Sequence, residues 1–132
     1  MRTVFIALTL AALSSAALSI CPAPASADPA AAPAGVHAAN GSLVDATGLP
    51  LYTFDWDTMK GMSHCIGQCA RDWPPLVAPA GAQPMGDWTI IIRDDGSRQW
   101  AYRDKPIYTY ANDTAGQAGT GEAAGSNWKL LH

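Results

Sequence analysis

The feature that most constrains the fold is a nine-residue segment that occurs twice. Residues 50–58 read PLYTFDWDT, and residues 106–114 read PIYTYANDT. Five of the nine positions are identical, and the Leu/Ile and Phe/Tyr pairs are conservative. Each copy is followed at a similar distance by a lone tryptophan, Trp73 or Trp128. The repeat therefore predicts two copies of one β-hairpin unit.

The rest of the pattern is typical of short antiparallel strands. Alternating, β-branched and aromatic runs predict strands over 42–45, 51–56, 87–92, 98–102 and 107–110. Turn residues separate these runs, and Asp95-Gly96 is a hairpin signal. The last three strands are joined by short turns and should form a meander. Two stretches without a pattern are predicted to be loops, residues 77–86 and 115–126.

Between the two copies lies a segment typical of one short helix. Ser63 is a suitable N-cap, and Pro74 should end the helix at Trp73. Cys65, Cys69 and Trp73 recur every four residues and so share one face. Four residues along a helix separate Cα atoms by roughly 6 Å, near the long end of what a disulfide spans. We therefore expect a mainly β fold of two related β-hairpin units, with five or more antiparallel strands and one short disulfide-pinned helix.

The first residues are typical of an export signal. Met1-Arg2 is positive, residues 4–20 are apolar, and Ala25-Ser26-Ala27 is a small-residue cleavage site. We predict a secretory signal peptide over 1–27, a flexible Ala/Pro-rich tether over 28–40 and a single β-rich repeat domain over 41–132. An uncleaved membrane anchor is a weaker alternative. Lipidation at Cys21 is another, but lipoprotein processing favours a small residue before the cysteine, and Ile20 is not small.

Composition excludes several classes of function. The chain has 8 Lys and Arg residues against 11 Asp and Glu residues and no basic stripe, so nucleic acid is not an expected partner. It has no Gly-x-Ser-x-Gly and no His-Glu-x-x-His, and we expect no catalytic and no cofactor-binding residue. Five tryptophans could form a platform for a sugar or an aromatic ligand, but in so small a domain we expect them in the core.

Two alternatives use the cysteines differently. Soft donors gather within eleven residues and would suit Cu(I), namely Met59, Met62, His64, Cys65 and Cys69. Alternatively, Cys65 and Cys69 could act as a reactive dithiol. Their spacing is one residue longer than the usual Cys-x-x-Cys, and no βαβ pattern surrounds them. With no metal site expected otherwise, copper is the only candidate cofactor.

The chain resembles the exported bacterial family of predicted lipoproteins with a Tyr-x-(Phe/Trp/Tyr)-x-x-Asp motif, also described as secreted repeats of unknown function. The motif occurs twice, and its marked residues are Tyr52, Phe54 and Asp57, then Tyr108, Tyr110 and Asp113. The family's Ser-x-Cys-x-Gly-x-Cys-Ala-x-x-Trp-Pro-Pro-Leu pattern matches residues 63–76. The resemblance implies export and a repeat fold, and it supplies no activity.

The motif residues allow two interpretations. The aromatic side chains could be core, with Asp57 and Asp113 capping the turns that follow, or they could line a ligand surface. We expect the first. The predicted function is an exported, non-enzymatic binding or structural module of the periplasm or cell envelope, with an unknown envelope partner or small ligand. Contact with a membrane is expected only if Cys21 is lipidated.

Overall fold

The computed structural model describes residues 32–132, which form seven strands and two short helices. The elements are, in chain order, β1 (His37–Ala39), β2 (Ser42–Val44), β3 (Tyr52–Phe54), α1 (Gln68–Asp72), β4 (Trp88–Ile92), β5 (Arg98–Tyr102), β6 (Lys105–Tyr108), α2 (Gly121–Ala124) and β7 (Trp128–Leu130). The predicted signal peptide, its cleavage site, Cys21 and the start of the tether lie outside the described residues.

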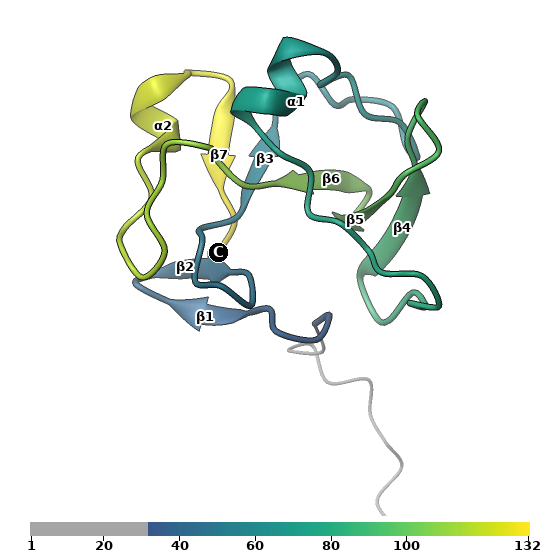
Figure 1. The fold of residues 1–132 in the computed structure, drawn as a ribbon, viewed down its shortest axis with the longest axis horizontal. Coiled ribbons are helices and arrows are strands. Elements are labelled where there is room, and N and C mark those ends of the chain that lie inside the picture. Colours follow the sequence, from purple (N-terminus) through teal and green to yellow (C-terminus); the bar gives the residue numbers. More distant parts are fainter. Residues whose placement is uncertain (1–31) are drawn as a thin grey trace, which may run out of the picture.

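The strands form two antiparallel sheets. The larger sheet has the order β4-β5-β6-β3-β7, and the smaller one pairs β1 with β2 (Figure 1). The predicted meander is present as β4, β5 and β6, and β6 continues the sheet into β3 of the first repeat. The mainly β fold with a disulfide-pinned short helix is therefore confirmed.

The two copies of the repeated segment pair with each other at the centre of the large sheet. In the β3–β6 ladder, Tyr52 lies directly opposite Tyr108. Successive residues of a strand point to opposite faces, and here both faces are buried. Leu51 and Ile107 enter a mixed aliphatic and aromatic cluster with Trp88 on one face. Tyr52 and Tyr108 enter an aromatic cluster on the other face.

The folded part begins earlier than the sequence analysis predicts. β1 lies inside the segment assigned to the tether and pairs with β2, with Ala39 opposite Ser42. The connecting residues Asn40 and Gly41 both have positive φ, 51° and 80°. Such two-residue turns favour Asn-Gly, which is the strongest short-range hairpin signal in a sequence. The predicted hairpin of β2 with β3 is reduced to an isolated bridge between Val44 and Pro50.

The helix near the cysteines is shorter than predicted. It begins after Gly67, whose φ of 61° is not helical, and it ends at Trp73 as expected from Pro74. Ser63 therefore lies outside the helix and does not cap it. The loop predicted over 115–126 contains α2, and the C-terminal residues form β7, which pairs with β3.

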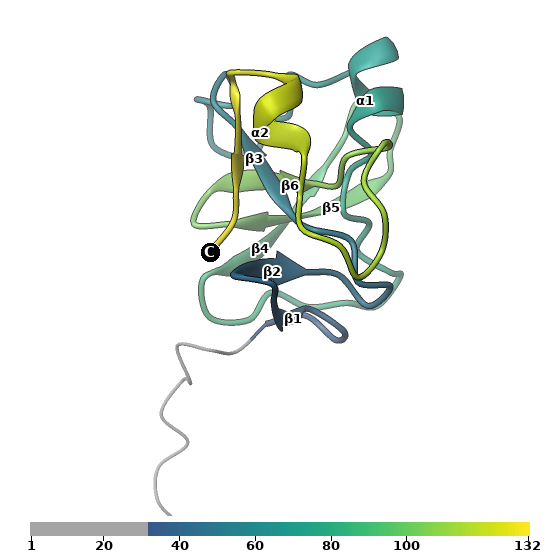
Figure 2. The same ribbon diagram turned by 90° about the vertical axis from the view of Figure 1, so that its left-hand side faces the viewer.

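Both helices lie at one end of the molecule, and β1 and β2 lie at the other (Figures 1 and 2). Within residues 32–132, neither helix has the length and apolar character needed to cross a bilayer. The large sheet between these ends carries the motif residues Tyr52, Phe54 and Tyr108.

Candidate functional site

The motif tyrosines and aspartates are exchanged between the two repeats. The Tyr108 hydroxyl donates a hydrogen bond of 2.6 Å to Asp57 Oδ2 of the first repeat. The Tyr52 hydroxyl donates one of 2.5 Å to Asp113 Oδ2 of the second repeat. Each repeat therefore provides the acceptor for the tyrosine of the other, and the motif holds the two halves together.

The second oxygen of each aspartate organises the loop that follows it. Asp57 Oδ1 accepts a hydrogen bond of 2.6 Å from the backbone N–H of His64. Asp113 Oδ1 accepts one of 2.9 Å from the backbone N–H of Thr120. Both donors lie seven residues after their aspartate, so the two loops are built alike. The side-chain to backbone bonds match the expected capping role, whereas the exchange with the tyrosines was not anticipated.

The protein environment keeps the two motif tyrosines neutral. Burial and the hydrogen bond to Asp57 raise the pKa of Tyr108 well above that of a free phenol. Burial and the hydrogen bond to Asp113 do the same for the pKa of Tyr52. Because a phenol that donates to a carboxylate must keep its proton, these tyrosines are poor candidates for general bases.

Four aromatic rings form a continuous stack across the boundary between the repeats. Trp73 and Trp128 stack face to face, with centroids 3.8 Å apart and an interplanar angle of 6°. Tyr110 stacks on Trp73 at 4.3 Å, and Phe54 stacks on Trp128 at 4.3 Å. The stack thus contains one tryptophan and one motif ring from each repeat. Most aromatic side chains of the motif therefore pack in the hydrophobic core, as expected.

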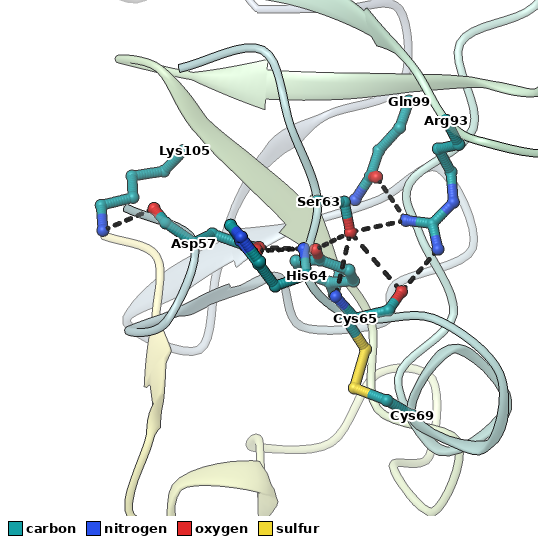
Figure 3. Close-up of polar contacts among 9 residues, drawn as sticks. Asp57, Ser63, His64, Cys65, Cys69, Arg93, Gln99 and Lys105 are labelled. Carbon is teal, nitrogen blue, oxygen red and sulfur yellow. Dashed lines mark hydrogen bonds and ion pairs between the residues drawn. A yellow bond between two sulfur atoms is a disulfide. The ribbon is translucent and has the colours of Figure 1, made fainter. Parts of the chain in front are cut away.

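A polar cluster surrounds Ser63 next to this aromatic core (Figure 3). The Arg93 guanidinium donates to Ser63 Oγ at 2.9 Å, to Gln99 Oε1 at 2.7 Å and to the Cys65 carbonyl at 2.6 Å. Gln99 in turn donates to the Ile107 carbonyl at 2.8 Å. Arg93 and Gln99 are buried, and sequence reasoning did not single them out. A buried arginine fixed by neutral acceptors acts here as a brace between the 63–65 segment and the β4–β5 hairpin.

The cysteines form a disulfide beside α1. Cys65 is fully buried, and it bridges to Cys69 in the first turns of the helix. In this disulfide neither sulfur is a free thiolate that could bind a metal or attack a disulfide substrate. The second repeat contains no cysteine. The bridge therefore belongs to the first repeat alone.

The other proposed copper donors lie together on an exposed loop. Met59, Met62 and the His64 ring are all solvent-accessible, and His64 Nδ1 is 3.4 Å from Asp57 Oδ1. Within residues 32–132, no three His, Cys, Asp or Glu side chains gather as a metal-binding group. Copper binding by the methionines and His64 stays a prediction.

An apolar groove lies on a different part of the surface. It has a volume of about 400 Å³ and separates residues 33–36 and the turn at 45–47 from the loop at 76–85. Its apolar lining includes Pro33, Val36, Leu76, Val77, Met85 and Trp100. The nearby carboxylate of Asp45 is occupied by its own turn, because it accepts hydrogen bonds from Thr47 and from the Leu49 N–H.

The match to known proteins follows the boundaries of the two halves. The family described as a secreted repeat of unknown function matches residues 36–77 and again residues 89–132. The chain belongs to this family. Neither a curated protein nor a solved structure matches the chain. The family description supports export and leaves the ligand open.

The two matched segments show which strands and helices belong to each repeat. The first repeat, residues 36–77, contains β1, β2, β3 and α1, and the second, residues 89–132, contains most of β4 with β5, β6, α2 and β7. The two ladder partners of β3, which are β6 and β7, both belong to the second repeat. The repeats are thus interlocked halves of one domain and not independently folded units.

Proposed function

We propose that this secreted repeat protein is a non-enzymatic binding module of the periplasm or cell envelope that holds a small apolar molecule. The observation that carries the proposal is the groove of about 400 Å³ beside Trp100. Pockets for small molecules have volumes of about 300–1,000 Å³ and mostly apolar linings. The groove meets both conditions.

The side chains best suited to chemistry support a binding role because they are engaged with one another. Asp57 holds Tyr108 and the His64 backbone, and Arg93 holds Ser63. A nucleophile or base needs a free lone pair beside a place for substrate. Tyr108, by contrast, is buried against its acceptor. A rigid scaffold with an apolar groove favours capture of a ligand over its conversion.

The test uses an uncharged hydrophobic probe, N-phenyl-1-naphthylamine, whose fluorescence rises in apolar sites. We expect saturable binding to the exported protein. Val77 lines the groove and is 62% exposed, so Val77→Asp should place a charge there without disturbing the core. We expect this variant to bind the probe at least tenfold more weakly, because a charge in an apolar site is costly to desolvate.

The matched control is Ile92→Asp. Ile92 is also a β-branched residue with 62% exposure, and it does not line the groove. It should bind the probe like the wild type. Equal binding by the Val77 and Ile92 variants, or no saturable binding by the wild type, would remove the groove as the ligand site.

A further inference from the structure

The two ends of the aromatic stack are built on the same backbone. The N–H of Asp55 donates to the Asn127 carbonyl at 2.8 Å, next to the Phe54 end. The N–H of Ala111 donates to the Asp72 carbonyl at 2.9 Å, next to the Tyr110 end. In the aligned repeats Asp55 corresponds to Ala111, so these two bonds are equivalent. A difference between the ends therefore comes from the side chains.

One motif position distinguishes the ends. In the first repeat it is Trp56, whose ring lies beside the Phe54 end of the stack, 5.8 Å from Phe54 and tilted by 34°. In the second repeat the same position is Asn112. Its short side chain has no ring to place beside Tyr110, and it donates instead to the Tyr110 hydroxyl at 3.1 Å.

A cleft of about 270 Å³ lies at the Tyr110 end. Its lining combines two stacked rings with polar groups, namely Asp72, Trp73, Tyr110, Ala111, Asn112 and Ala124. The volume is just below the range for drug-sized ligands, so it suits a single ring. The first repeat thus supplies its own planar group at one end of the stack, and the second repeat leaves room for one from outside.

The polar atoms of the cleft define the chemistry of that ring. Asp72 Oδ1 accepts from Gln68, and Asn112 Nδ2 donates to Tyr110. Asp72 Oδ2 and Asn112 Oδ1 have no partner among residues 32–132, and both can accept from hydroxyl groups. A sugar ring provides such hydroxyls around an apolar face that can lie on an aromatic ring. Asp72 and the net charge of −3 disfavour an anionic sugar.

We propose that the cleft beside Tyr110 and Asn112 binds a neutral pyranose ring, with Asp72 and Asn112 accepting hydrogen bonds from its hydroxyls. This site shares no residue with the apolar groove and goes beyond the function proposed for it. Envelope polysaccharides present such rings, and so do free sugars. Comparing free monosaccharides with the same unit in an oligosaccharide separates these sources.

The experiment measures saturation-transfer NMR between the exported protein and glucose, galactose, mannose and N-acetylglucosamine at millimolar concentration. We expect transfer to at least one of these sugars and none to glucuronate. Asn112→Trp gives the second repeat the residue that the first already has, so this variant should fold and should lose at least tenfold in sugar affinity. Trp56→Asn changes the opposite end of the stack and should bind like the wild type.

A second variant guards against misfolding of the first. Asp72 is exposed, so Asp72→Ala should keep the unfolding temperature and weaken sugar binding at least fivefold. The proposal is overturned if none of the four neutral sugars binds, or if folded Asn112→Trp binds as well as the wild type. The naphthylamine probe serves as the independent readout of the groove. Sugar binding without probe binding would refute only the proposed ligand site in the groove. Probe binding without sugar binding would refute only the proposed sugar site.

Discussion

The exchange of tyrosine and aspartate between repeats gives a sharp prediction for Tyr108→Phe. The substitution keeps the ring in the aromatic core and removes only the hydroxyl. That hydroxyl donates to Asp57, which is 1% exposed, and it also lies 2.6 Å from Ser63 Oγ. Asp57 Oδ2 then loses its hydrogen-bond donor at a position that is almost fully buried.

The magnitude follows from the two lost bonds. A hydrogen bond to a charged group contributes about 1.5–3 kcal/mol, and a neutral one contributes about 1 kcal/mol. We therefore expect Tyr108→Phe to lower the free energy of unfolding by about 3 kcal/mol. For a domain of this size that corresponds to a fall in Tm of roughly 12–24 °C. Urea unfolding followed by tryptophan fluorescence measures the change directly, provided that the m-value is unchanged.

Tyr102→Phe is the matched control. Tyr102 is half-buried against Trp88, and its hydroxyl has no hydrogen-bond partner among residues 32–132. It should change stability by less than about 0.5 kcal/mol. A Tyr108→Phe variant as stable as this control would refute the importance of the exchanged hydrogen bond.

A double-mutant cycle tests the exchange itself. Tyr108→Phe should couple to Asp57→Asn, which lies in the other repeat, by more than about 1 kcal/mol. It should be additive with Asp113→Asn, which lies in its own repeat, to within about 0.5 kcal/mol. The opposite pattern would mean that each tyrosine is held by the aspartate of its own motif.

Three further predictions concern the same core. Folding raises the pKa of Tyr52 and Tyr108, so the unfolded chain loses these two protons at a lower pH than the folded chain does. The free energy of unfolding should therefore be constant below about pH 10 and should fall above it by about 1.4 kcal/mol per pH unit for each tyrosine. Urea unfolding across pH 9–12 measures this fall. Gly121→Ala should destabilise the domain by about 1–3 kcal/mol in a thermal melt, because its Cβ would lie 2.6 Å from Tyr52 and 2.7 Å from Trp73. Replacing Cys65 and Cys69 together by Ala should cost about 2 kcal/mol in the same melt, since a bridge across so short a loop restricts the unfolded chain only slightly; a loss above about 5 kcal/mol would contradict a local role.

The strands could be predicted from the sequence because their side chains alternate or are β-branched. Thr89 to Ile92 and Gln99 to Tyr102 are such runs, and both are strands in the structure. The β1–β2 hairpin was also within reach, because Asn40-Gly41 is its turn. It was missed because the Ala/Pro-rich sequence before it resembles a linker.

The exchange between repeats could not be predicted, because it depends on which strand β3 selects as its partner. A strand of three residues pairs equally well with several neighbours on local grounds, and long-range packing decides among them. The helix start was misjudged for a local reason. Ser63 has the side chain of an N-cap, but Arg93 and Tyr108 engage its hydroxyl, and Gly67 places the helix start four residues later.

The interlocked ladder has a consequence for how such proteins are assembled. A polypeptide ending after the first repeat would present β3 without either of its ladder neighbours, and Asp57 without its phenol. Two copies of that fragment would satisfy each other as these halves do within one chain. The smallest unit that pairs all of its strands is therefore two repeats. Larger proteins built from this unit should contain even numbers of repeats or form homodimers.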